Sequence, residues 1–526
     1  MLHSGWKYCR RRRVDDAKPS AAVMRTKRLP RLRLAHGLAC LGLVALGAIV
    51  TGCTGRERVE RPPNFIIILT DDQGYADVGV YGARGFDTPN LDRLAQDGIR
   101  FTSFYMANSA CSPSRAALLT GSYPDRVGMP RVLGPRSTIG LNPDEITIAE
   151  LLKSRGYATA AVGKWHLGDH PVFLPTNQGF DTYFGIPYSN DMSPDPRNNP
   201  RPHASGHPPL PLIRDTTIIE REPDQSTLTR RYTEEVIAFI ETHADRPFFV
   251  YLAHTFPHVP LYASQHFRGS TEQGLYGDVI SEIDASLGAI LATLERLGLD
   301  QHTLIAFTSD NGPWLIFGNH SGSAGPLREG KGTTFEGGQR VPGIMRWPGQ
   351  IPAGQVSNEP VTAMDFLPTL ARLAGAELPA DRVIDGHDIW PLLAGVPGAR
   401  SPYEKFFYYR TGQLQAVRSG RWKLHVPHAY WTTVGGEIGR DGVPGSYAEV
   451  EIGFSLFDLE ADIGETTDVA GQHPDVVERL LRFIEEGRRD IGDDITESVG
   501  TGARRPGQVA EPWERQMTNG SGNRRN

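Results

Sequence analysis

The 526-residue sequence has few cysteines, no internal repeats and no excess of basic charge. Its four cysteines are too few for a disulfide scaffold. The hydrophobic share of 39% is ordinary for a globular protein and excludes a wholly disordered or collagen-like chain. A formal net charge of −6 argues against nucleic acid as a partner, because nucleic-acid binding requires a basic face. We therefore expect one large globular domain and a smaller one.

Residues 1–52 have the features of an export signal. They contain eleven Lys and Arg against two acidic residues, and the basic part precedes an apolar run over 34–50. A basic segment, an apolar segment and small residues at its end describe a secretory signal peptide. The run ends in Val50-Thr51-Gly52-Cys53, which resembles the lipobox of bacterial lipoproteins, where the cysteine is lipidated.

The alternative is an uncleaved membrane helix, which His36 and the four glycines between Leu34 and Gly52, the last of them Gly52 itself, disfavour. Met24 begins an equally complete signal, so either methionine could be the start. Without residues 1–52 the chain has 44 basic and 59 acidic residues, a net charge of −15. We expect an exported lipoprotein of the bacterial periplasm or cell surface, anchored to the inner or outer membrane through Cys53, with residues 53–63 as a tether.

Short apolar runs alternate with amphipathic helical patterns between residues 64 and 400. Strands are expected at 64–69, 158–162, 248–253 and 303–308, and helices at 91–96, 146–154, 229–243 and 279–297. This alternation predicts an α/β domain in which helices sandwich a large mixed, mostly parallel sheet. Residues 186–223 lack a sustained period and are expected to form a long loop at the rim of the sheet.

After residue 400 the pattern changes to short strands followed by one helix. Strands are expected at 406–409, 415–417, 422–426 and 455–458, and an apolar stripe over 476–484 predicts the helix. Residues 401–496 should therefore form a smaller α+β subdomain with a short antiparallel sheet. Residues 497–526 are polar and rich in Gly and Arg, so we expect a disordered tail.

Two of the expected strands end in oxygen-bearing side chains. Asp71 and Asp72 follow the first strand, and Asp310 and Asn311 follow the strand at 303–308. In open α/β sheets, ligands bind at the carboxyl ends of the strands. If the two strands are neighbours, three carboxylates and one amide converge, a set that suits Ca²⁺ or Mg²⁺ and not zinc. Either motif alone would indicate only a turn.

Cys111 precedes a helical pattern, within Cys111-Ser-Pro-Ser-Arg115 followed by Ala-Ala-Leu-Leu. At a helix N-terminus, amide donors and the helix dipole favour negative charge. Arg115, four residues later, lies on the same helix face. A lone cysteine is more often a small buried hydrophobic residue, but the Pro-Ser-Arg that follows favours a functional role.

Basic side chains near other strand ends suggest an anion-binding site. Lys164 and His166 follow the strand at 158–162 and would point to one side of an extended backbone. His258 and Lys331 could add further donors. Each residue alone is more often structural or solvated, so the suggestion depends on their combination.

Taken together, these segments resemble the sulfatase family, of the arylsulfatase type within the alkaline-phosphatase superfamily, over about 64–375 and more weakly over 403–495. The Cys-Ser-Pro-Ser-Arg motif, followed by Ala-Ala-Leu-Leu-Thr-Gly, is similar to the sequence that converts a cysteine into formylglycine. The order of the motifs matches the family throughout. The resemblance implies hydrolysis of sulfate monoesters, either aryl sulfates or sulfated carbohydrates, and a formylglycine-generating enzyme as a partner.

The resemblance also implies roles for individual residues. Cys111 would be oxidised to an aldehyde and hydrated to a gem-diol, one hydroxyl of which attacks sulfur, and Arg115 would steady it. The metal, usually calcium in this family and possibly magnesium, would be held by the oxygen ligands and the modified cysteine: Asp71, Asp72, Asp310, Asn311 and Cys111.

The remaining roles concern the sulfate. Lys164, His258 and Lys331 would bind sulfate oxygens or the leaving group. His166 would hydrogen-bond the second hydroxyl of the gem-diol and act as the base that lets it expel sulfate. Ser189 would be the family's sulfate-side serine, although its neighbour Asn190 stands where a histidine is expected in animal relatives.

Two other functions remain open at this point. One is a formylglycine-dependent phosphonate monoester or phosphodiester hydrolase of the same superfamily. The other is a non-catalytic lipoprotein that binds sulfated glycans, which would require damage to the metal or nucleophile set, and the sequence shows none. Specificity is expected in the loops 186–223 and 426–450, with Trp314, His320 and His428 as candidate rim residues.

Overall fold

The computed structural model describes residues 62–196 and 206–513. The expected signal peptide, Cys53 and most of the tether lie outside the described residues, as do 197–205 and 514–526. Within the described ranges, no helix is both long enough and apolar enough to cross a bilayer.

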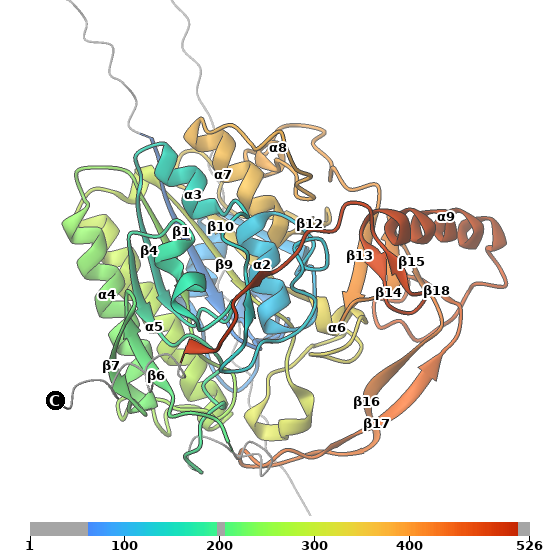
Figure 1. The fold of residues 1–526 in the computed structure, drawn as a ribbon, viewed down its shortest axis with the longest axis horizontal. Coiled ribbons are helices and arrows are strands. Elements are labelled where there is room, and N and C mark those ends of the chain that lie inside the picture. Colours follow the sequence, from blue (N-terminus) through green and yellow to red (C-terminus); the bar gives the residue numbers. More distant parts are fainter. Residues whose placement is uncertain (1–61, 197–205, 514–526) are drawn as a thin grey trace, which may run out of the picture. The chain divides into compact units, whose positions relative to one another are not determined.

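An eleven-stranded mixed sheet forms the centre of the larger domain. Five neighbouring strands are parallel, in the order β9 (Thr303–Ser309), β1 (Asn64–Thr70), β8 (Phe248–Ala253), β4 (Ala158–Gly163) and β5 (Thr182–Gly185). Every residue of β1 is buried, which explains why its sequence is continuously apolar rather than alternating. The expected large, mostly parallel sheet is confirmed (Figure 1).

Both margins of the sheet contain antiparallel strands. Beyond β9, β10 (Arg340–Arg346) runs antiparallel to β9 and to β2 (Ile99–Tyr105), and the short β11 (Gln355–Ser357) and β12 (Val361–Thr362) run parallel to β2. Beyond β5, β6 (Pro211–Arg214) and β7 (Thr217–Arg221) form a hairpin. The expectation of a structureless loop over 186–223 is therefore wrong for 211–221. The apolar part of β6 is too short to show a period, although Leu212 and Ile213 are buried.

Helices cover both faces of this sheet. Side chains of β1 alternate between two core clusters, with Phe65 and Ile67 in one and Ile66 and Ile68 in the other. The first cluster includes residues of α2 (Cys111–Thr120), α3 (Ile148–Ser154) and α7 (Phe366–Ala374). The second includes residues of α1 (Pro89–Gln96), α4 (Leu228–Thr242) and α5 (Leu275–Arg296).

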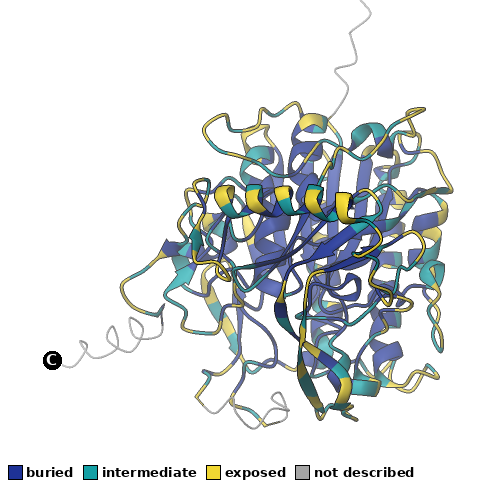
Figure 2. Ribbon diagram, turned by 90° about the vertical axis from the view of Figure 1, so that its right-hand side faces the viewer, coloured by how far each residue is buried: buried dark blue, intermediate teal, exposed yellow. Residues whose placement is uncertain are grey.

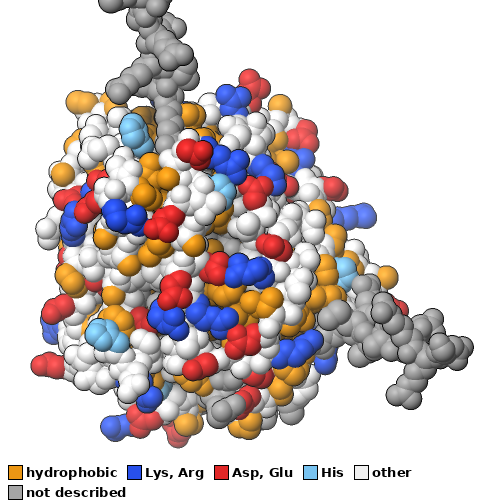
Figure 3. Space-filling view, turned by 90° about the vertical axis from the view of Figure 1, so that its left-hand side faces the viewer, with side chains coloured by type: hydrophobic (Ala, Val, Ile, Leu, Met, Phe, Trp, Pro, Cys, Tyr) orange, Lys and Arg blue, Asp and Glu red, His pale blue; other side chains and the backbone are white. Residues whose placement is uncertain are grey.

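The outer side of α4 is charged. Its Arg230 pairs with Glu234 at 2.7 Å, and Arg231 pairs with Glu220 of β7 at 2.8 Å. Figure 3 shows basic and acidic side chains interspersed on this face of the molecule, the left-hand side of Figure 1. Mixed charge of this kind keeps a surface solvated without a strong field of one sign.

The C-terminal subdomain is a four-stranded antiparallel sheet with one long helix. Its strands are β13 (Phe406–Arg410), β14 (Gln413–Ser419), β15 (Trp422–His425) and β18 (Ser455–Asp458). Helix α9 (Pro474–Asp490) buries Leu480 and Ile484 against them, and its outward side is exposed (Figure 2). The smaller α+β unit is confirmed, but β16 (His428–Glu437) and β17 (Ser446–Ile452) were not anticipated; they form a long hairpin where the sequence suggested a loop.

Part of the chain expected to be disordered is ordered. Over 497–513, β20 (Ser498–Val499) pairs with β19 (Gly492–Asp493), and β21 (Gly507–Gln508) pairs with β3 (Ile139–Gly140) of the larger domain. Trp513 is buried in the first core cluster. The expectation is therefore wrong for this stretch, because a polar segment gains order here from backbone pairing and one aromatic anchor.

Short helices α6 (Glu336–Gln339) and α8 (Trp390–Leu393) complete the larger domain.

Replacing Trp513 with Ala should lower the free energy of unfolding by about 3 kcal/mol, because a large buried side chain leaves a cavity. Val499→Ala is the matched control in the same segment, since Val499 is 90% exposed; its effect should stay within about 0.5 kcal/mol. Urea unfolding followed by circular dichroism measures both. Equal effects of the two substitutions would contradict the docking of this segment.

Candidate active site

The carboxyl ends of four neighbouring parallel strands, β9, β1, β8 and β4, meet at one edge of the sheet. The polar residues that follow these strands come together there: Asp71, Asp72, Lys164, His258, Asp310 and Asn311. The backbone N–H of Asp72 donates to Oδ1 of Asp310 at 3.1 Å, and Nδ2 of Asn311 donates to Oδ1 of Asp72 at 2.8 Å. The structure thus brings the two acidic motifs into direct contact.

The three aspartates are buried close to one another. Burial would raise the pKa of Asp71, but Lys164, His258 and Arg115 together hold it well below its usual range. Burial raises the pKa of Asp72, and its ion pair with Lys331 at 2.7 Å offsets this only in part. Burial and the charge of Asp71 raise the pKa of Asp310 to about 7. Such crowded carboxylates favour a cation among them.

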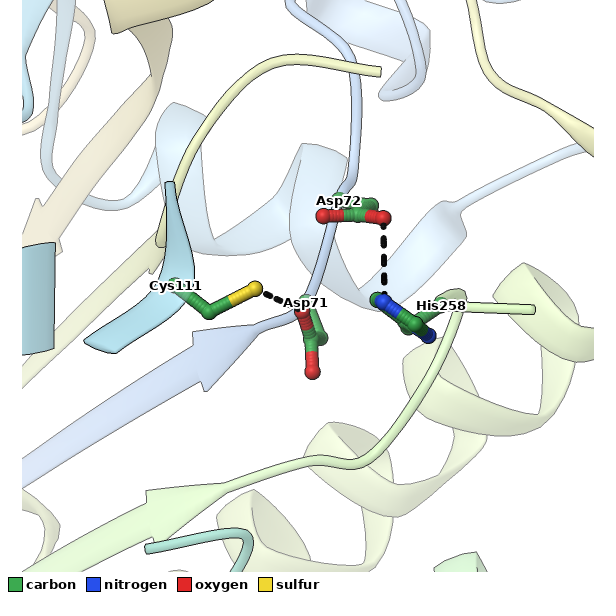
Figure 4. Close-up of side chains that lie close together, drawn as sticks. All are labelled: Asp71, Asp72, Cys111 and His258. Atoms are coloured by element: carbon green, nitrogen blue, oxygen red, sulfur yellow. Dashed lines mark hydrogen bonds and ion pairs between the residues drawn. The ribbon is translucent and has the colours of Figure 1, made fainter. Parts of the chain in front are cut away.

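A hard divalent metal ion fits this set of ligands. The Oδ1 atom of Asn311 is buried and has no hydrogen-bond partner, so an amide oxygen is available beside the carboxylates. Potential ligand atoms of Asp71, Asp72, Cys111 and His258 all lie within 4.8 Å of one another (Figure 4). Asp310 lies beside them, because its Oδ1 accepts a hydrogen bond from the backbone N–H of Asp72. Carboxylate and amide oxygens are the ligands that Ca²⁺ and Mg²⁺ prefer.

Cys111 is the first residue of α2 and points at the acidic group. Its Sγ donates to Oδ1 of Asp71 at 3.4 Å (Figure 4), and the residue is 2% exposed. Burial and the neighbouring charge of Asp71 raise the pKa of the thiol, so the thiolate is disfavoured. The unmodified cysteine therefore stays a protonated thiol, which is a poor nucleophile.

Arg115 connects α2 to two strand ends. One turn after Cys111, it is fully buried and donates to Oδ2 of Asp310 from Nε at 3.0 Å and from a terminal nitrogen at 2.8 Å. Its other terminal nitrogen donates to the carbonyl of Lys164 at 2.6 Å. A planar guanidinium with all its contacts fixed holds the start of α2 in one position.

Lys164, Ser189 and His258 form a continuous chain of contacts beside the aspartates. The Lys164 ammonium pairs with Oδ2 of Asp71 and donates to the Ser189 hydroxyl at 3.2 Å. That hydroxyl lies 3.4 Å from Nε2 of His258, which in turn lies 3.7 Å from Oδ2 of Asp72. His258 Nδ1 donates to the carbonyl of Val259 at 2.6 Å, so this nitrogen must be protonated.

His166 does not lie on extended backbone, so the prediction that it and Lys164 point to one side of an extended segment is wrong. Its φ of +62° is left-handed. It nevertheless lines the same cavity as Cys111. Nε2 donates to the carbonyl of Leu133 at 2.8 Å, and Nδ1 is buried without a hydrogen-bond partner. Burial lowers the pKa of His166, so its ring is neutral, and because Nε2 donates, Nδ1 is the unprotonated nitrogen.

Lys331 lies on a loop that the C-terminal subdomain holds in place. Its Nζ also lies 4.4 Å from the ring centre of Trp314. At the end of the loop, Glu336 accepts from Lys423 of β15 at 3.0 Å, and the Glu336 backbone N–H donates to Glu465 at 2.7 Å. All three of these charged residues are fully buried. The subdomain thus contributes to the position of a residue at the site.

A cavity of about 310 Å³ opens over Cys111. Its inner wall includes Cys111, His166, Ser189, His258 and Lys331, while Arg115 and Lys164 lie behind it. Trp314 lines the cavity as expected for a rim residue, but His320 and His428 do not; His428 is buried and donates from Nδ1 to the carbonyl of Val426.

Sequence reasoning missed several residues of the outer wall, among them Arg131, Arg410 and Trp431. The two segments expected to determine specificity do reach the cavity, through Met192 and Trp431. Arg410 ends a short strand of the other subdomain, and no local motif distinguishes it.

Comparisons with known proteins agree with this geometry. The sulfatase family model matches residues 63–376, a model for the C-terminal region of aryl-sulfatase matches 401–513, and one for the C-terminal part of N-sulphoglucosamine sulphohydrolase matches 330–431. Arylsulfatase A of Homo sapiens is 41% identical over 452 residues, which cover 81% of this chain and 87% of that protein.

Two further relatives extend the comparison. N-acetylgalactosamine-6-sulfatase of Canis lupus familiaris is 42% identical over 410 residues, covering 74% of this chain and 75% of that protein. The crystal structure of Ps i-CgsB in complex with k-i-k-neocarrahexaose superposes with a TM-score of 0.70 at 30% identity, covering 84% of this chain and 96% of that one. The protein therefore belongs to the sulfatase family and is a sulfuric ester hydrolase.

Proposed function

We propose that the protein hydrolyses sulfate monoesters of carbohydrates with a formylglycine formed from Cys111 as the nucleophile. The observation that supports this most directly is the position of Cys111: it begins α2, its Sγ contacts Asp71, and it faces a cavity lined by Lys331, His258 and His166. A buried unmodified thiol with a raised pKa would be inert there, whereas a hydrated aldehyde supplies a hydroxyl that attacks sulfur and a second one that later expels sulfate.

The cationic side chains suit a sulfuryl group. A sulfate monoester has one negative charge spread over its oxygens, and more charge develops on the leaving oxygen during cleavage. Lys164, His258 and Lys331 surround the acidic group on different sides, and Ser189 links the first two. We assign them to the sulfate oxygens and the leaving group, because fixed donors in a buried site stabilise developing charge strongly.

Asp71, Asp72, Asp310 and Asn311 are the residues that would hold the metal, for which we propose Ca²⁺. When bound, such an ion acts as a Lewis acid on a sulfate oxygen. Arg115 keeps Asp310 and the start of α2 in a fixed relation to these ligands. Lys331 and Lys164 meanwhile balance the negative charge of Asp72 and Asp71.

His166 is our candidate for the base of the second step. Because Nε2 donates to the backbone carbonyl of Leu133, Nδ1 is the ring nitrogen that remains as an acceptor. The residue lines the cavity together with Cys111. Removal of a proton from the second hydroxyl re-forms the aldehyde and releases sulfate. A neutral imidazole can take that proton, which a histidine protonated on both nitrogens could not.

A carbohydrate leaving group agrees with the relatives and with the cavity. One relative is an N-acetylgalactosamine-6-sulfatase, and the solved structure of Ps i-CgsB is a complex with k-i-k-neocarrahexaose. The cavity of about 310 Å³ lies at the small end of ligand sites, so it would enclose the sulfated unit and leave any longer saccharide in solvent.

We also propose that the protein is exported and anchored by a lipid on Cys53. The basic segment, the apolar run and Val50-Thr51-Gly52-Cys53 support this. Export would place the enzyme where extracellular sulfated glycans are accessible.

Cys111→Ala should lower the hydrolysis of 4-nitrophenyl sulfate by about 10³-fold or more, because the nucleophile is lost. The melting temperature should stay near the wild-type value, since one small side chain facing a cavity is removed. Retention of a tenth of the wild-type rate would contradict the assignment. Mass spectrometry of the wild-type peptide should show about −18 Da at Cys111, from thiol to aldehyde.

Dialysis against EDTA should lower both the activity and the melting temperature, and Ca²⁺ should restore both, because an ion that binds only the folded state stabilises it. In Asp72→Asn, added Ca²⁺ should shift the melting temperature much less than in the wild type. Parallel titrations with Mg²⁺ identify the preferred ion. A wild-type melting temperature indifferent to chelation and to both ions would exclude the metal.

Cys53→Ser should move the protein from the membrane fraction to the soluble fraction, since acyl chains provide the anchor. Cys40→Ser, within the apolar run, is the matched control and should stay with the membrane. The measurement is immunoblotting of fractionated cells that express the full chain. If Cys53→Ser also remains with the membrane, the anchor is not a lipid on this residue.

A further inference from the structure

The C-terminal subdomain contributes part of the outer wall of the cavity. Arg410 is the last residue of β13, Thr411 follows it in the turn, and Trp431 lies on β16 (Figure 1). None of these residues touches the group of aspartates, so they face whatever projects from the sulfate toward solvent. They contact the leaving-group side of a substrate, if the proposed function is correct.

Aromatic packing holds Arg410 in place. Its guanidinium carbon lies 4.3 Å from the ring centre of Trp431. Trp431 stacks on Tyr447 of β17, with ring centres 5.8 Å apart and planes inclined by 17°. The hairpin β16–β17 therefore fixes the indole, and the indole supports the guanidinium by a cation–π contact.

Arg410 differs from the other cations of the cavity in having no acidic partner. Lys331 pairs with Asp72 at 2.7 Å, and Arg131 pairs with Asp494 at 3.2 Å. Across residues 62–196 and 206–513, no carboxylate oxygen lies within 4.0 Å of the Arg410 guanidinium, although Glu449 is near enough to influence its charge. A partly buried cation without a partner is unfavourable, and an anion arriving with the substrate would compensate it.

We propose that Arg410, supported by Trp431, binds a second anionic group on the leaving-group side of the substrate; this rests on the proposed function. The guanidinium fork matches two oxygens of a carboxylate or of another sulfate. The substrate class is then a polyanionic saccharide, in which the sulfated ring or its neighbour bears a further oxyanion. A cavity of about 310 Å³ is small enough for one substrate to reach both Cys111 and Arg410.

Binding can be separated from catalysis in the Cys111→Ala protein. The probes are phenyl sulfates with a carboxylate at the 2-, 3- or 4-position, each compared with its methyl ester, and a parallel series with a sulfonate. Tryptophan fluorescence reports the Kd, since Trp314 and Trp431 line the cavity. We expect at least one acid to bind about tenfold more tightly than its ester, and Arg410→Gln to abolish that preference. The carboxylate and sulfonate series distinguish the two kinds of oxyanion.

Two variants separate recognition from folding. Arg410→Lys should keep part of the preference, because it retains the charge but not the fork, and Trp431→Leu should weaken it. Arg482→Gln is the matched control: Arg482 is 61% exposed on α9 and pairs with Glu478 at 2.9 Å, and its loss should change neither Kd. The proposal would be overturned if Arg410→Gln weakened the binding of acid and ester equally. It would also be overturned if the Cys111→Ala protein bound no acid more tightly than its ester.

The proposed function is tested independently by wild-type hydrolysis of unsubstituted phenyl sulfate. Absence of that hydrolysis would contradict the proposed function, while the binding preference of the Cys111→Ala protein would still be measured. Hydrolysis without any preference for the acids would contradict only the role of Arg410. The two failures therefore give different results.

Discussion

The site depends on the close burial of negative charge at the ends of β1 and β9. The side chains of Asp71, Asp72 and Asp310 lie close together and are almost inaccessible to solvent. Such an arrangement is stable only if cations oppose it, and Arg115, Lys164 and Lys331 do so from three separate segments. Of these cations, Arg115 and Lys164 are fully enclosed, whereas Lys331 faces the cavity.

This electrostatic requirement explains why the larger domain and the C-terminal subdomain are tightly joined. The loop with Lys331 is secured at Glu336, whose partners Lys423 and Glu465 belong to the subdomain. Burial would raise the pKa of Glu336, but Lys423 and Arg340 hold it well below its usual range. A buried ion-pair network gives little net stability, yet it fixes one arrangement of the segments that it connects.

The sequence predicted features that depend on local pattern. Continuous apolar runs indicated the parallel strands, and acidic residues after two of them indicated where oxygen ligands would meet, because parallel strands end at a common edge. Features set by distant partners were missed. The order of 497–513 depends on pairing with β3 and on the buried position of Trp513. The left-handed backbone of His166 depends on the contacts of the segment that follows β4. The side chain of Arg410 is supported by the hairpin folded against it, which its own sequence neighbours do not reveal.

The β16–β17 hairpin has a consequence for how such an enzyme can diversify. It contributes Trp431 to the cavity wall, and within the described part of the chain its two strands form a sheet of their own and no hydrogen bond or ion pair joins it to the three aspartates. Mutations at its exposed positions, such as Val434, can therefore accumulate without disturbing bond cleavage, whereas Tyr430 and Thr432 contact the loop that holds Lys331. New substrate preferences could evolve by remodelling this one appendage while the ancestral reaction centre stays unchanged.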